Sequence, residues 1–118
     1  MSRLGDRQAE ILAAIRAGSL RVATSGRFSA PGVILEPADP WTEPARMPGR
    51  TARYQLTAVA GTPDSDAALG QLAEIIDAVD AALRKVDGVG LPTWSKPADR
   101  IVGEIAHAVS VGTFTVSL

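Results

Sequence analysis

A chain of 118 residues, of which 46% are hydrophobic and only 4% aromatic, predicts a single domain over residues 1–118 with one aliphatic core. The formal net charge of −1 argues against a general affinity for nucleic acid or for anionic membranes. The absence of cysteine excludes disulfides, thiolate metal sites and cysteine nucleophiles. There is no signal-peptide pattern and no apolar run near the length of a membrane span, so we expect a cytoplasmic protein at synthesis.

The first part of the chain predicts a helix over residues 2–17, because apolar residues recur there at helical spacing and Gly18 is a natural stop. The residues on this apolar face are Leu4, Ile11, Leu12 and Ile15. After the helix, residues 20–24 predict a short strand and residues 25–32 a turn. The apolar run at residues 33–35 is too short for a helix and predicts a buried strand.

Residues 37–50 contain four prolines in fourteen positions, which disfavours both a helix and an interior strand. We therefore expect a long connection, and such connections are often functional. Residues 52–60 then alternate between apolar and polar side chains, which predicts a half-buried strand antiparallel to the one before the connection. One face would carry Tyr54, Leu56 and Ala58, and the other Arg53, Gln55 and Thr57.

Residues 64–86 give the strongest helix signal, with Thr62 as a plausible N-cap, Pro63 at the first helical position and Gly88 as the stop. The predicted apolar stripe consists of Leu69, Leu72, Ile76, Val79, Leu83 and Val86, and Ile75 and Ala82 widen it. A stripe of this length is enough to cover one face of a sheet. A coiled-coil seam is the alternative, although the segment is barely three heptads long and lacks flanking charge pairs.

The C-terminal third is ambiguous between two kinds of element. Alternation near the end favours a strand over residues 105–117, and a helix over residues 98–109 is the alternative. Together the elements predict an α+β fold. It would be a mostly antiparallel β-sheet of about four to five strands, with an N-terminal helix and one long amphipathic helix packed on it.

Few residues suggest chemistry, and we expect no enzyme, no cofactor and no metal site. His107 is the only histidine, and no nucleophile motif accompanies it, so we expect a structural role. Asp77 and Asp80 lie on the polar face of the long helix, where solvated carboxylates are expected. The segment Gly88–Gly90 follows a helix, so it predicts a helix stop and a turn rather than a phosphate site.

One cluster has the character of a partner interface, because Trp, Met and Arg are enriched in interface cores. Its members are Trp41, Arg46, Met47, Arg50 and Arg53. Two other interpretations stay open, namely that Trp41 packs back on its own core and that the arginines contact nucleic acid. Charge also differs along the chain: residues 21–60 are net positive and residues 64–87 net negative, which allows complementarity between copies or simply two solvated faces.

The run Ile34–Pro37 through Trp41, followed by the strand Arg53–Gly61 leading into the helix Asp64–Leu83, resembles the tail terminator proteins of long-tailed bacteriophages. The resemblance is greatest to phages that infect actinobacteria, and it covers nearly the whole chain. Trp94 and the β-rich end stand where that family has its last strands.

The resemblance implies a non-enzymatic virion protein, assembled in the bacterial cytoplasm as a homo-oligomeric ring of six subunits at the head-proximal end of the tail. Such a ring ends tube polymerisation and gives the head a docking face, so the implied partners are the tail tube protein and the head–tail connector. We expect no membrane and no sequence-specific nucleic acid among its partners. The alternatives are another neck protein, such as a head-completion or stopper subunit, and a small ferredoxin-like ligand-binding domain.

Overall fold

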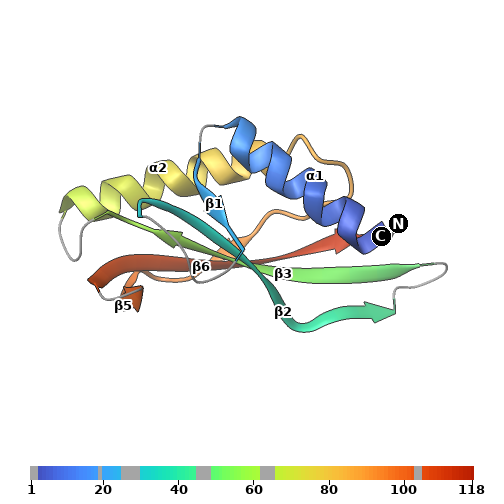
Figure 1. Cartoon of the computed structure of the whole chain (residues 1–118). Helices are drawn as coiled ribbons and strands as arrows, with labels where there is room; N and C mark the ends of the chain where they lie inside the picture. The colour runs from blue at the N-terminus through green and yellow to red at the C-terminus, as the bar shows by residue number, and fades with distance from the viewer. Residues whose placement is uncertain (1–2, 19, 25–29, 45–48, 62–65, 103–104) are drawn as a thin grey trace.

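The computed structural model describes residues 3–18, 20–24, 30–44, 49–61, 66–102 and 105–118. Its elements follow one another as α1 (Arg3–Ala17), β1 (Val22–Ala23), β2 (Gly32–Pro44), β3 (Arg50–Val59), α2 (Asp66–Leu83), β4 (Thr93–Trp94), β5 (Ala98–Val102) and β6 (Ile105–Ser117). Both helices lie on the same side of a single long sheet (Figure 1). The predicted α+β class is therefore confirmed, with a mixed sheet of six strands in the described part of the chain.

Strand β3 lies at the centre of the sheet, between the two longest strands, β2 and β6. Strand β3 pairs with β2 on one side and with β6 on the other, from Thr51↔Ser117 to Val59↔Val109. The other edge of β6 receives β4 and β5 one after the other, so that residues 93–102 run antiparallel beside it. The pairing of β1 with β2 is parallel, which makes the sheet mixed.

The predicted loop over residues 37–50 is wrong for its first half, because β2 continues to Pro44 and pairs again with β3 at Thr42–Pro44. The register shifts between Pro37 and Thr42, and this irregularity absorbs extra residues. Strand β1 pairs only with Val33 and Ile34, so the later part of β2 is an edge strand. Proline is tolerated at an edge because its missing N–H would face solvent. Residues 45–48 lie outside the described part of the chain.

Helix α2 covers the sheet as predicted, but its buried face is rotated from the predicted stripe. The buried residues are Ala68, Leu72, Ile75, Val79, Ala82 and Leu83. Leu69, which the stripe included, is 52% exposed, and Ile76 is only half-buried. The rotation has a physical reason: α2 packs against α1 as well as against β3 and β6, so its buried face must serve more than one neighbour.

The predicted C-terminal strand is confirmed, and the structure adds a hairpin partner to it. Strand β6 has the predicted bounds at residues 105–117, and the alternative helix over residues 98–109 is wrong. In its place, β5 and β6 form a hairpin with Val102 paired to Ile105. The two short strands β4 and β5 raise the number of strands above the predicted four to five. In the described part of the chain, no helix is long and apolar enough to cross a membrane.

Trp94 of β4 lies flat over Gly112 of β6, and this contact requires glycine. A Cβ atom at Gly112 would lie 2.8 Å from Cε3 of the Trp94 ring. The indole Nε1 of Trp94 also donates a hydrogen bond of 3.2 Å to Oδ1 of Asp80 on α2. The ring therefore ties the outer edge of β6 to the polar side of α2.

We expect Gly112→Ala to lower the free energy of unfolding by about 1–3 kcal/mol, because the ring must move away from its hydrogen bond with Asp80. Gly70→Ala is the matched control, since a Cβ there would have no atom within 4 Å. In the middle of an exposed helical face, that alanine should instead stabilise by about 0.5–1 kcal/mol. Urea unfolding of both variants measures the difference, and equal effects would contradict the packing described for Trp94.

Candidate partner interface

Trp41 stands at one end of a row of aromatic rings. Its ring meets Tyr54 edge-on, with centroids 6.5 Å apart and an angle of 80°, and Tyr54 stacks on Phe114 at 5.9 Å. The Tyr54 hydroxyl donates a hydrogen bond of 3.1 Å to Oε1 of Gln8 in α1. Burial raises the pKa of Tyr54 above its usual value, and an interaction with the Trp41 side chain partly opposes the rise. Tyr54 is thus an uncharged side chain, fixed in position, that supports the Trp41 ring.

Trp41 itself remains 41% exposed, although one edge of it touches the core residue Tyr54. Trp41 therefore packs on its own domain and still offers a large apolar surface. Aromatic side chains with such a supported, half-exposed position lose little conformational entropy on binding a partner. Trp41 is the best-placed anchor in the predicted cluster.

Arg50 lies at the same end of the molecule as Trp41, where β3 begins. Its Nη2 donates a hydrogen bond of 3.2 Å to Oγ1 of Thr42, the residue next to Trp41. A shallow hollow of about 430 Å³ opens here, lined by Arg3, Leu4, Thr42, Gly49, Arg50 and Leu118. Its lining combines two exposed guanidinium groups with two leucines, which suits an acidic and partly apolar partner.

The other members of the predicted cluster do not all join this surface. Arg53 neighbours Tyr54 in β3 and is paired in register with Thr115, so it lies on the sheet face away from the helices. Arg46 and Met47 lie outside the described part of the chain. The structure therefore brings Trp41 and Arg50 together at one end and separates Arg53 from them.

The residues considered for chemistry have structural partners. His107 is buried in β6, and its Nδ1 lies 2.8 Å from the carbonyl oxygen of Ala60, where β3 ends. Asp80 was predicted to be merely solvated, but it accepts the hydrogen bond from Trp94. Among the residues that the structure describes, no group of histidine and acidic side chains could hold a metal ion.

We expect His107→Ala to keep the fold, because the ring has a backbone carbonyl as its partner and serves to hold β6 beside the end of β3. Removing it leaves the Ala60 carbonyl with one hydrogen bond fewer, which should lower the free energy of unfolding by about 1–2 kcal/mol. Thermal unfolding measures this loss, and circular dichroism at low temperature shows whether the fold is kept. A variant as stable as the original protein would contradict this structural role of His107.

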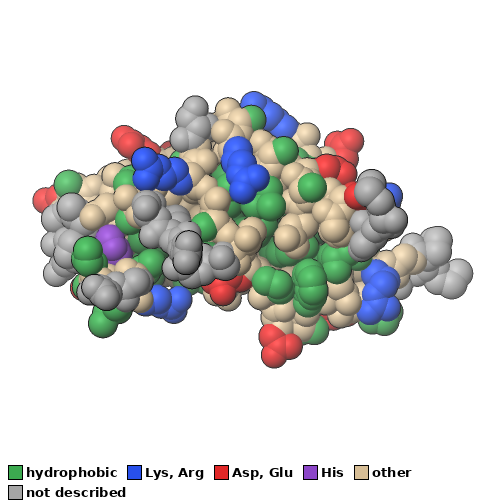
Figure 2. Space-filling view, in the orientation of Figure 1, with side chains coloured by type: hydrophobic (Ala, Val, Ile, Leu, Met, Phe, Trp, Pro, Cys, Tyr) green, Lys and Arg blue, Asp and Glu red, His purple; other side chains and the backbone are tan. Residues whose placement is uncertain are grey.

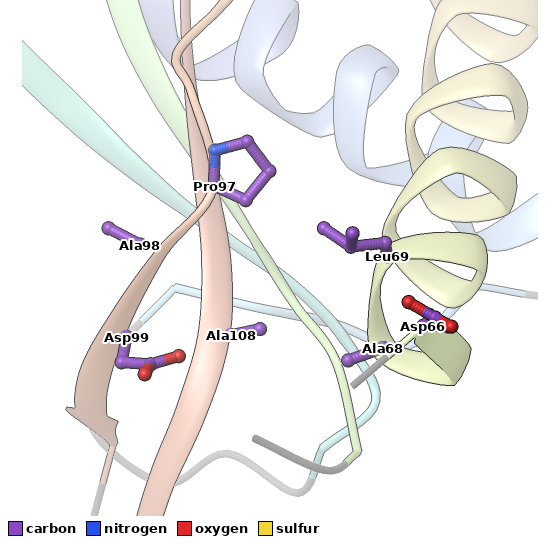
Figure 3. Close-up of a pocket in the computed structure, with 7 residues that line it drawn as sticks. All are labelled: Asp66, Ala68, Leu69, Pro97, Ala98, Asp99 and Ala108. Atoms are coloured by element: carbon purple, nitrogen blue, oxygen red, sulfur yellow. The ribbon is translucent and has the colours of Figure 1, made fainter. Parts of the chain in front are cut away.

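A second hollow of about 430 Å³ lies between the start of α2 and the β5–β6 hairpin, and sequence patterns did not reveal it. It is lined by Asp66, Ala68, Leu69, Pro97, Ala98, Asp99 and Ala108. Figure 3 shows Leu69 and Pro97 pointing toward each other across it, with Asp66 on α2 and Asp99 on β5 at its margins. Asp66 and Asp99 are far apart in the sequence, so only the pairing of β5 with β6 brings them together.

The sequence matches no protein-family model and no curated protein.

Proposed function

We propose that this chain is a structural subunit of a bacteriophage tail terminator, which forms a ring at the head-proximal end of the tail tube. The ring would end tube polymerisation and offer the head connector a docking face, and the chain would have no catalytic activity. The proposal is supported by the order of elements, a helix, a long β2–β3 hairpin, a second helix and a β-rich end. This is the order on which the resemblance to that family rests.

The observation that carries the proposal furthest is the Trp41 end of the molecule. A large aromatic ring is held half-exposed on a rigid base, next to a hollow with two arginines and two leucines. Enzymes need a concave site with convergent polar groups, whereas this end has the composition of an interface. We therefore assign Trp41 and Arg50 to contacts with a neighbouring subunit, the tube end or the head connector.

Point substitutions test this better than removal of residues 37–50, since removal would also delete the β2–β3 pairs at Thr42–Pro44. We expect Trp41→Ser combined with Arg50→Ser to yield a folded protein that fails to terminate tails. The expected phenotype is tails of uncontrolled length, or tails that do not join heads. Electron microscopy of lysates from phage carrying the substitutions gives the readout.

Leu91→Ser is the matched control, because Leu91 is also a large apolar residue, 43% exposed, but lies on the other side of the sheet from β2, where Gly90 pairs with Thr115 of β6. It should give tails of normal length on filled heads. Normal assembly by the Trp41 and Arg50 variant as well would reject the proposed interface. Tails of normal length that carry the protein within the neck, not at the tube end, would instead indicate a head-completion or stopper subunit.

A further inference from the structure

The molecule is elongated, with principal extents of 46 × 24 × 24 Å, and its two hollows lie at opposite ends of the long axis. Figure 1 shows the start of α2 and strand β5 at one end. The N-terminal turn of α1, the end of β6 and the start of β3 lie at the other. We call the end with Asp66 and Asp99 the acidic end, and the end with Arg3 and Arg50 the basic end. The two ends therefore face away from each other in one copy of the chain.

The acidic end combines two carboxylates with uncovered apolar side chains. Asp66 and Asp99 line its hollow, and Leu69 beside them is 52% exposed. Ile101 is 72% exposed and lies two residues beyond Asp99 in β5, which places both on the same face of the strand. Arg100 is paired with His107 and falls on the opposite face of β5, so its charge points away from Asp99.

The basic end has the complementary composition. Arg3 and Arg50 are both exposed, and they line the hollow together with Leu4 and Leu118. The nearest acidic residue of β2, Glu43, is paired with Thr51, and this pair lies on the other face of the sheet from Thr42 and Ala52. The hollow therefore presents two arginine and two leucine side chains, and no acidic side chain is among its lining residues.

We propose that the acidic end of one copy of this chain docks on the basic end of the next. Arg3 and Arg50 of one copy would meet Asp66 and Asp99 of its neighbour, while Leu69 and Ile101 of the neighbour cover Leu4 and Leu118. Arginine pairs well with carboxylates when apolar contacts exclude water around them. The inference rests on the proposed ring and names the surfaces that would close it.

This contact is heterologous, because one surface meets a different surface on the neighbour. Heterologous contacts generate closed rings or open filaments, whereas a contact between identical surfaces stops at a dimer. The arrangement also explains why the exposed side chains of Leu69 and Ile101 can be kept on one small protein. Figure 2 shows hydrophobic side chains reaching the surface at the acidic end, around β5.

Cross-linking tests the head-to-tail order directly, because the native chain has no cysteine. We introduce Pro44→Cys, which is paired with Arg50 across β2 and β3, and Ala98→Cys, which lines the acidic hollow beside Asp99, separately and together. The four charged residues of the proposed contact stay in place, and the purified proteins are treated with a short bismaleimide. The chain with both cysteines should give a ladder of dimers, trimers and higher oligomers. Each single-cysteine chain should give at most a trace of dimer, since its cysteine faces a position without one.

Charge reversal provides the second arm in the same two-cysteine chain. Adding Asp66→Arg should reduce the ladder at least about tenfold, since it places a third positive charge against Arg3. Adding Arg3→Asp as well should restore the ladder, because the pair is then reversed rather than lost. Circular dichroism melting must show that each variant is folded before its ladder is compared.

Three results would overturn the inference. They are a two-cysteine chain that stays monomeric, single-cysteine chains that dimerise as well as the two-cysteine chain, and a reversed pair that does not recover. The outcome is separable from that of the proposed function. A ladder combined with tails of normal length on filled heads from phage that lack this chain would reject the proposed function and keep the head-to-tail contact. Tails of uncontrolled length from the Trp41 and Arg50 variant, together with a two-cysteine chain that gives no ladder, would keep the proposed function and reject the head-to-tail contact.

Discussion

Ile75→Asp is expected to leave this domain unfolded at room temperature. Ile75 is 4% exposed and faces the core from α2, between Leu72 and Val79. Burying an aspartate there removes the transfer free energy of the isoleucine and places an unpaired carboxylate in an apolar site, which costs several kcal/mol. Small domains have a total free energy of unfolding of about 5–15 kcal/mol, so the expected loss is a large share of it.

Ile76→Asp is the matched control, because it changes the same residue type at the next position of the same helix. The pattern in the sequence placed Ile76 at the centre of the apolar stripe, but the structure leaves it half-buried at the edge of the core. We expect this variant to remain folded, with a loss of about 1–2 kcal/mol. Circular dichroism and urea unfolding compare the two, and the opposite order of stability would show that α2 packs in the other orientation.

Arg7→Met is expected to lower the free energy of unfolding by about 2–3 kcal/mol, although arginine on a helix is usually a surface residue. The Arg7 guanidinium is buried and connects three elements. Its Nε donates to the carbonyl of Ser117 at 3.2 Å, its Nη2 donates to the carbonyl of Asp87, and its Nη1 pairs with Glu10 at 2.8 Å. Methionine keeps most of the packing but leaves the two carbonyls without this donor.

Glu10→Gln is the control for Arg7, since it keeps the volume and removes only the exposed half of the ion pair. The Glu10 side chain is 52% exposed, and ion pairs of this kind contribute less than about 1 kcal/mol. Thermal unfolding should therefore show a fall in Tm of roughly 8–15 °C for Arg7→Met and only a few degrees for Glu10→Gln. Equal shifts would mean that the ion pair, and not the carbonyl contacts, stabilises the end of β6.

Local patterns were sufficient wherever a side chain's neighbours in the sequence decide its conformation. The helix at the start, the long second helix and the strand over residues 105–117 follow from the spacing of apolar residues. Of the predicted partner residues, Trp41 and Arg50 lie at the same end of the molecule, where Arg50 bonds to Thr42, the neighbour of Trp41 in β2. Arg53 does not, because the alternation of β3 turns it to the opposite face of the sheet.

The remaining features depend on where each strand lies in the sheet, and local sequence patterns do not specify that position. The prolines of residues 37–44 are compatible with a strand only because β1 stops short and leaves β2 at the edge. Strands β4 and β5 are too short to form alone, and they exist because β6 offers them a free edge. The face that α2 buries depends on its contacts with α1, β3 and β6 together. The sequence alone determines that this chain makes two amphipathic helices, and it favours a strand over a helix at the C-terminus. The tertiary structure decides which of their surfaces remain uncovered, since that depends on pairings between residues far apart in the chain.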